Sequence, residues 1–170
     1  MPQTSMQELN GIAGSSKEFL SEHLLDFLQT TQAKDVGTKL KNDAATKSLK
    51  PVEAFELEVK DKMSNAAHEI LQCIERVEDA MKQSTEMDIK NYLRYARTNL
   101  EEASRDIDAA EQAYKSLEIY HRRIEKASVV LGKELEVIMT ELFNKMEQLK
   151  SYQKVLLEKC SMAINNSGGA

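Results

Sequence analysis

Cysteine and histidine, the residues that build disulfide frameworks and zinc sites, are scarce in this chain. Its 170 residues include two cysteines, Cys73 and Cys160, and three histidines. The cysteines stand far apart in the sequence, and neither has a second cysteine or a histidine at metal-ligand spacing. We therefore expect no disulfide framework, no metal and no cofactor, and we interpret both cysteines as reduced thiols in or near the core.

Tryptophan is absent, and prolines and glycines are few. The chain contains two prolines and six glycines, whereas 30% of its residues are charged. Proline and glycine are poor helix formers, while glutamate, lysine, alanine and leucine lose little side-chain freedom in a helix. This composition is typical of long amphipathic helices and predicts a single domain of the all-α class.

A surplus of positive charge is also missing, as is any long apolar run. The net charge of −5 argues against nucleic acid as a partner, because phosphate binding requires an excess of lysine and arginine on one face. No stretch approaches the roughly 20 apolar residues of a membrane span, and the N-terminal sequence lacks the pattern of a secretory signal. We expect a cytoplasmic protein, although delivery by a specialised secretion machine would leave the same pattern.

The dominant positive feature is a hydrophobic seam that runs from residue 89 to residue 163. Two rows of residues repeat at heptad spacing, and most positions in both rows are apolar or aromatic. Members of the two rows include Leu93, Leu100 and Ile107 on one side and Ala96, Ala103 and Ala110 on the other. A repeat of 3.5 residues predicts helices packed along a seam, as in a coiled coil, and the alanines allow close approach of a neighbouring helix.

Residues 1–50 are predicted to contain one short helix between two flexible segments. Residues 1–14 are polar and are expected to form a flexible N-terminus. Ser15 and Glu18 have the spacing of a capping box, which predicts a short amphipathic helix over residues 15–33. Its apolar face consists of Phe19, Leu20, Leu24, Phe27 and Leu28. The lysine-rich residues 34–50 are expected to form a linker.

A helical hairpin is predicted to follow the linker, as part of a bundle domain over residues 51–164. Proline at a first helical position costs no hydrogen bond, so a helix is expected to begin at Pro51 and to reach Met81. Thr85, with Asp88 three residues later, is expected to cap the next helix. Because the connection is so short, the two helices should be antiparallel. Residues 165–170 are expected to form a flexible tail.

The sequence leaves open whether residues 86–164 form one helix or two. His121 and Ser128 are polar members of one row, and Gly132 follows closely. The heptad register nevertheless continues through this region, which favours an elongated antiparallel hairpin with a long, continuous or kinked, coiled-coil-like C-terminal helix. The alternative is a break between residues 126 and 132, which would give a compact three-helix bundle of the spectrin type.

No arrangement of residues suggests catalysis. The sequence contains no glycine-rich phosphate loop, nucleophile elbow, paired catalytic carboxylates or cysteine–histidine dyad. Glu118 and His121 have the Glu-x-x-His spacing of dimetal bundles, but neither His23 nor His68 supplies the second pair that such a centre requires. We therefore predict that the protein is not an enzyme and has no catalytic, cofactor-binding or metal-binding residue.

The apolar stripe widens beyond residue 128, and a wide stripe needs more neighbours than a hairpin supplies. We therefore predict an interaction surface at Leu131, Leu135, Ile138, Leu142, Phe143, Leu149 and Leu156. The leading hypothesis is a helical scaffold or adaptor that binds protein partners by helix packing, either by self-association or as a subunit of a larger complex.

The alternative hypothesis is a membrane-surface protein of the trafficking or secreted-effector kind, which would insert the helix of residues 15–33 into lipid. The acidic polar face of that helix, with Glu18, Glu22 and Asp26, speaks against this. Candidate basic patches consist of Lys90, Arg94 and Arg97 and, about four heptads further on, of Arg122 and Arg123. Such a patch could dock an acidic partner or an anionic lipid, or it could be an ordinary solvated helix face.

Overall fold

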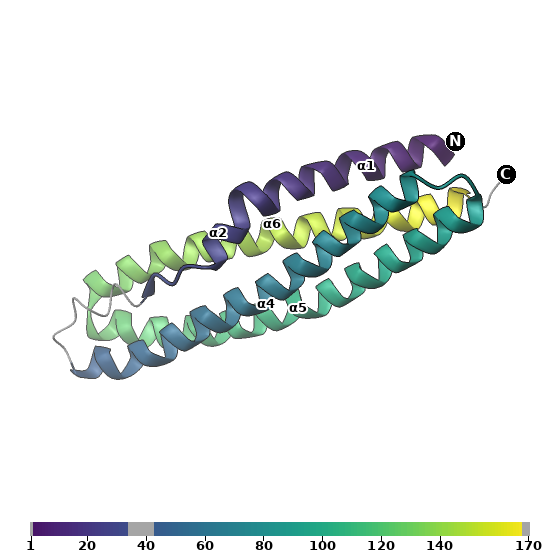
Figure 1. Cartoon of the computed structure of the whole chain (residues 1–170). Coiled ribbons are helices and arrows are strands. Elements are labelled where there is room, and N and C mark those ends of the chain that lie inside the picture. Colours follow the sequence, from purple (N-terminus) through teal and green to yellow (C-terminus); the bar gives the residue numbers. More distant parts are fainter. Residues whose placement is uncertain (1, 34–42, 168–170) are drawn as a thin grey trace.

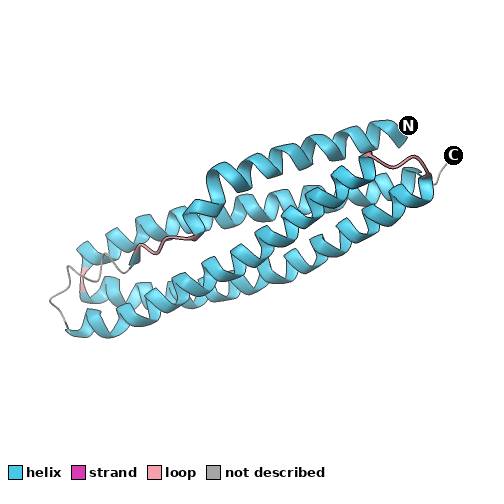
Figure 2. Cartoon of the chain, in the orientation of Figure 1, coloured by secondary structure: helices cyan, strands magenta, loops and turns pink. Residues whose placement is uncertain are grey.

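The structure, a computed structural model of the chain, describes residues 2–33 and 43–167. All regular secondary structure in these residues is helical, so the all-α prediction is confirmed. The elements are α1 (Pro2–Phe19), the π-helical turn η1 (Leu20–Leu24), α2 (Leu25–Leu28), α4 (Asp43–Met81), α5 (Glu86–Ala127) and α6 (Val129–Ser167). Short connections join α4 to α5 and α5 to α6 (Figure 2).

Within the described residues, the three long helices form an elongated bundle that α1 completes over half of its length (Figure 1). α5 packs along both α4 and α6, which make few direct contacts with each other. α1 contacts both α4 and α6. The half of the bundle near the α4–α5 connection therefore contains four helices. The other half contains the three long helices and the described residues that follow α1, up to residue 33.

The α4–α5 hairpin forms as predicted. The Thr85 hydroxyl oxygen accepts a hydrogen bond from the Asp88 backbone N–H at 3.2 Å, which caps the first turn of α5. Ala96, Ala103 and Ala110 are fully buried. These small side chains allow α5 to approach its neighbours closely, as the alanine row indicates.

The expected continuous helix over residues 86–164 is interrupted, so the alternative with a break is the correct one. α5 ends at Ala127, Ser128 is extended (φ −154°, ψ 111°), and α6 begins at Val129. The Ser128 hydroxyl oxygen accepts a hydrogen bond from the Leu131 N–H at 3.4 Å, and the Ser128 carbonyl accepts one from the Gly132 N–H at 3.0 Å. The heptad register survives the reversal because both helices turn their apolar rows toward the same core.

Gly132 allows the two helices to approach closely at this reversal. A Cβ atom at Gly132 would lie 2.8 Å from Cα of Glu125, which is backbone and cannot move aside cheaply. We expect Gly132→Ala to lower the free energy of unfolding by about 1 to 3 kcal/mol, the usual cost of overpacking. Urea denaturation followed by circular dichroism measures this change.

Gly11 provides the matched control for this substitution. A Cβ atom at Gly11 would have no neighbour within 4 Å, and the residue lies in the exposed part of α1. Gly11→Ala is therefore expected to stabilise the protein by about 0.4 to 1 kcal/mol, because alanine restricts the unfolded chain without strain in the helix. Equal stability of the Gly132→Ala variant and the natural chain would contradict the close approach.

The N-terminal helix begins much earlier than the sequence predicts. α1 starts at Pro2, so residues 2–14 are helical instead of flexible, and Ser15 lies inside the helix instead of capping it. Leu9 and Ala13 are at most 1% exposed, in line with Leu20 at the end of the same buried face. Burial of this face against α4 and α6 overrides the weak helix propensity of the segment.

Two further predicted boundaries are wrong for a similar reason. α4 begins at Asp43, so Pro51 lies within the helix and the linker is helical from residue 43 onward. Pro51 lies beyond the first turn of α4, where proline removes one backbone hydrogen bond and crowds the carbonyl four residues earlier, and burial of Leu49 and Val52 beside it offsets that cost. α6 continues through Ser167, so residues 165–167 are not a flexible tail. The predictions for residues 34–42 and 168–170 lie outside the described residues.

Candidate functional site

The apolar residues of α6 that were predicted to bind a partner lie mostly in the core of the chain itself. Leu135, Leu142, Leu149 and Leu156 are at most 1% exposed, while Leu131 and Ile138 are half-buried against the same core. Phe143 is 41% exposed, and its ring lies 5.6 Å from that of Tyr114 on α5. α5 and the N-terminal helix supply the neighbours that the sequence left unassigned.

The predicted apolar face of the N-terminal helix is likewise covered by the chain itself. Phe19, Leu20 and Leu24 are at most 4% exposed, and Phe27 and Leu28 are half-buried. The Phe19 ring stacks on Tyr152 of α6, with 5.1 Å between the ring centroids. Insertion of this face into lipid would require α1 to leave the bundle.

The surface beneath α1 is matched to that helix by three polar contacts. The Asn166 amide donates a hydrogen bond to the Ser5 hydroxyl at 2.6 Å, Lys159 lies 3.2 Å from the Glu8 carboxylate, and Lys17 lies 3.4 Å from the Glu78 carboxylate. We call the surface that includes Glu78 of α4 and Tyr152, Lys159 and Asn166 of α6 the α1 docking surface.

These polar contacts determine the register and direction of α1 and contribute little to the free energy of its docking. Each of the two ion pairs is at least a quarter exposed, and ion pairs at such positions contribute about 0 to 1 kcal/mol. The contacts lie near the start, middle and end of α1, so they specify its register and direction. The free energy that holds α1 in place comes mainly from burial of its apolar face.

A single π-helical turn separates α1 from α2. In η1 the Leu25 N–H donates a hydrogen bond to the Leu20 carbonyl, five residues earlier. Leu20 and Leu24, the first and last residues of this turn, are both buried. The path of the chain bends here and leads from α1 toward α4 (Figure 1). Turns of this kind are rare and are frequently found at functional positions.

Two buried charged residues of α4 hold the segment that follows α2. The Glu56 carboxylate accepts hydrogen bonds from the backbone N–H groups of Gln32 at 3.0 Å and Ala33 at 3.3 Å. The Lys60 ammonium donates to the Thr30 carbonyl and lies 4.4 Å from the centroid of the Phe27 ring. We call Glu56 and Lys60, together with residues 30–33, the Lys60 anchor.

The electrostatics of the Lys60 anchor reflect its burial. Glu56 and Lys60 are each 1% exposed, and the Lys60 ammonium lies 4.0 Å from the Glu56 carboxylate. Burial lowers the pKa of Lys60 from its ordinary value of 10.5, while the carboxylates of Glu56 and Glu141 act to raise it. A buried charge without a partner is costly, so Lys60 depends on these neighbours.

Sequence reasoning missed the Lys60 anchor although a signal was present. Glu56 and Lys60 are four residues apart, and they share a helix face with the buried residues Val52, Val59 and Met63. Charged residues on an otherwise apolar face are rarely buried unless they are paired. The partners here are backbone groups from a distant segment, which no local pattern identifies.

The two predicted basic patches lie at opposite ends of α5. Lys90, Arg94 and Arg97 lie near the start of α5, whereas Arg122 and Arg123 lie near its end. At 1.5 Å per residue, the two groups are about 40 Å apart along the helix. Arg94, Arg122 and Arg123 are exposed, and the Arg123 guanidinium lies over the Tyr120 ring at 4.8 Å. The structure does not bring these residues together.

His121 and the two cysteines contact other parts of the helical bundle. The His121 side chain makes a 2.7 Å hydrogen bond to the Gly132 carbonyl, which links α5 to the first turn of α6. The Cys160 thiol donates to the Leu93 carbonyl at 3.2 Å, and burial raises its pKa to about 11. Burial also raises the pKa of Cys73. Both thiols are therefore protonated at neutral pH.

Among residues 2–33 and 43–167, no three or more histidine, cysteine, aspartate or glutamate side chains gather in a way that could hold a metal ion. None of the helices in these ranges combines the length and the apolar character needed to cross a membrane.

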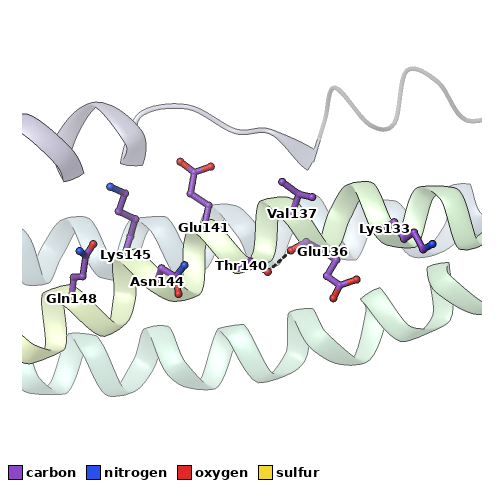
Figure 3. A pocket seen from close by; sticks show the side chains of 8 residues that line it. All are labelled: Lys133, Glu136, Val137, Thr140, Glu141, Asn144, Lys145 and Gln148. Atoms are coloured by element: carbon purple, nitrogen blue, oxygen red, sulfur yellow. Dashed lines mark hydrogen bonds between the residues drawn. The ribbon is translucent and has the colours of Figure 1, made fainter.

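One pocket is an open region of about 720 Å³ on the outer side of α6 (Figure 3). It is lined by Lys133, Glu136, Val137, Thr140, Glu141, Asn144, Lys145 and Gln148. All of these residues come from one helix, and Val137 is the sole apolar residue among them. This lining does not enclose a ligand, so the α1 docking surface and the Lys60 anchor are the stronger candidate sites.

Comparisons of the chain with protein-family models, with curated proteins and with solved structures found no match.

Proposed function

We propose that the protein is a non-enzymatic helical scaffold or adaptor that binds a partner helix on the α1 docking surface. The observation that carries this proposal is the position of α1. It spans α4 and α6, which otherwise make few direct contacts, and thereby serves as a fourth helix on a core of three. Packing of an amphipathic helix on an apolar surface is a common mode of protein recognition.

The contacts of α1 indicate what kind of helix would bind. Its buried face presents apolar or small side chains such as Leu9 and Ala13 at helical spacing, and Leu20 of η1 continues that face. A partner helix would need the same spacing to bury a comparable apolar area, together with polar groups that match Glu78 and Lys159. α5 keeps its own contacts with α4 and α6 when α1 is exchanged for such a helix.

A labelled peptide tests whether the docking surface accepts a helix from another molecule. A fluorescein-labelled peptide of residues 2–28 is added to the full chain, and fluorescence anisotropy is followed until it is constant. We expect saturable binding that excess unlabelled peptide reverses. The control peptide carries Leu9→Ser and Leu20→Ser, which remove two buried apolar side chains, and it should not bind. Equal binding of the two peptides, or binding of neither, would rule the proposal out.

A further inference from the structure

α1 is built to open more readily than the long helices. Gly11 and Gly14 lie on its exposed side, and a Cβ atom at either position would have no neighbour within 4 Å. Packing therefore does not require glycine at these positions, and glycine weakens a helix. The π-helical turn η1 interrupts the helix at its C-terminal end. These features lower the stability of α1 without any gain in packing.

Residues 30–33 are attached to the bundle by buried contacts, unlike α1 with its ion pairs at the surface. Residues 30–33 are tied to α4 by hydrogen bonds to the buried side chains of Glu56 and Lys60. The ion pairs of α1, in contrast, lie at the surface of the molecule. α1 can therefore leave its docking surface while the Lys60 anchor stays in place, and η1 and α2 lie between the two.

The docking surface is complementary to the sequence of α1 along its whole length. Ser5 meets Asn166, Glu8 meets Lys159, and Lys17 meets Glu78. Phe19 adds a stacking contact with Tyr152. A second copy of the chain carries the same residues in the same register, so its α1 reproduces every one of these contacts. Exchange of identical elements is a low-cost route to dimers for this reason.

From these observations we infer that the partner of the α1 docking surface is a second copy of this chain. Each molecule places its α1 on the docking surface of the other, and the Lys60 anchor keeps each α1 connected to its own core. This inference rests on the proposed function, because it names the partner of the same surface. The dimer forms at high protein concentration, where a second copy competes with the chain's own α1.

Disulfide trapping between two variants tests the exchange. One full-length variant carries Ser5→Cys and the other carries Asn166→Cys, at two side chains that are 2.6 Å apart in the structure. The mixture is incubated at high concentration and then oxidised with oxidised glutathione. We expect a disulfide-linked dimer, and mass spectrometry should identify the linkage between positions 5 and 166. The natural cysteines are buried and compete little for the oxidant.

Three control variants make the result decisive. Ser5→Cys mixed with Glu101→Cys measures random cross-linking, because Glu101 is exposed on α5. A single chain with both Ser5→Cys and Asn166→Cys should form the bond internally and lose the ability to exchange. When Gly11→Ala and Gly14→Ala are added to the Ser5→Cys and Asn166→Cys variants, the mixture should cross-link roughly ten-fold more slowly, because both alanines strengthen α1.

The outcomes of the two experiments separate failure of the dimer inference from failure of the proposed function. If the doubly substituted chain closes its internal disulfide but the mixture gives no linkage between positions 5 and 166 above the control, the second copy is not the partner. The proposed function survives that result when the peptide of residues 2–28 still binds, and it fails when the peptide does not. A cross-linking rate that the two alanines leave unchanged would overturn the role assigned to the glycines.

Discussion

Leu142→Ala is expected to lower the free energy of unfolding by about 2 to 5 kcal/mol, the usual cost of removing a large apolar side chain from a core. Leu142 is 0% exposed and lies in the middle of α6. The substitution removes its contacts and leaves a cavity that the surrounding helices fill only in part. Urea denaturation followed by circular dichroism measures the change, at two protein concentrations.

The neighbouring residue supplies the control. Phe143 is 41% exposed, so Phe143→Ala should cost clearly less than Leu142→Ala although it removes a larger side chain. The comparison also separates the core from a partner surface. If Leu142 instead contacted a second protein, its loss would change association and leave the unfolding of the free chain nearly unaltered. Equal losses for the two variants would contradict the burial of Leu142 in the core.

Glu56→Gln is expected to destabilise the protein by about 3 kcal/mol at neutral pH, because removing one partner of a buried ion pair leaves the other charge uncompensated. The amide has nearly the same shape as the carboxylate and can still accept a backbone hydrogen bond. What the substitution removes is the negative charge that lies 4.0 Å from the Lys60 ammonium. Thermal or urea unfolding at constant ionic strength measures the loss.

This loss should shrink as the pH rises. Burial lowers the pKa of Lys60 below 10.5 in the folded chain. Between the lowered pKa and 10.5 the unfolded chain binds more protons than the folded chain, so stability rises with pH in that window. Removal of Glu56, which acts to raise the pKa of Lys60, lowers the pKa further and widens the window. The Glu56→Gln penalty should therefore be smaller at about pH 9.5 than at about pH 7.

A second substitution isolates the charge. Lys60→Met in the Glu56→Gln background removes the uncompensated ammonium and places an apolar side chain among buried neighbours. Most of the lost stability should return, because apolar replacement of a buried pair is often close to neutral. A penalty that is the same at both pH values and that persists in the double variant would show that the hydrogen bonds to residues 32 and 33, and not the charge, govern the anchor.

The proposed exchange of α1 depends on how stability is divided between the core and α1. The core leucines of α6, such as Leu142 and Leu149, hold the three long helices together. α1 is added to that core by an apolar face and by surface contacts of small energy. The proposal requires that α1 leaves its docking surface while the three long helices stay folded. Variants of the core leucines should therefore affect mainly the stability of the three long helices, whereas variants of α1 should affect association as well as stability.

The sequence by itself determined the features that depend on local chemistry. Heptad spacing identified the helical class and the repeating leucines of α6, but it assigned those leucines to a partner surface, whereas they pack in the core of the chain itself. The Thr85 cap depends on residues three positions apart, and the alanine row of α5 depends on spacing within one helix. Such features follow from the geometry of a single helix, so a single sequence is enough to read them.

The tertiary structure alone decided the features in which distant segments meet. Residues 2–14 are helical because α4 and α6 bury one face of α1, and α4 extends through Pro51 because its neighbours bury Leu49 and Val52. The reversal at Ser128 follows from packing of two helices on one core, since the heptad pattern is the same with or without it. Glu56 and Lys60 are buried because residues 30–33 supply their backbone partners. Each of these outcomes depends on contacts between residues far apart in the chain, and local propensity carries no information about them.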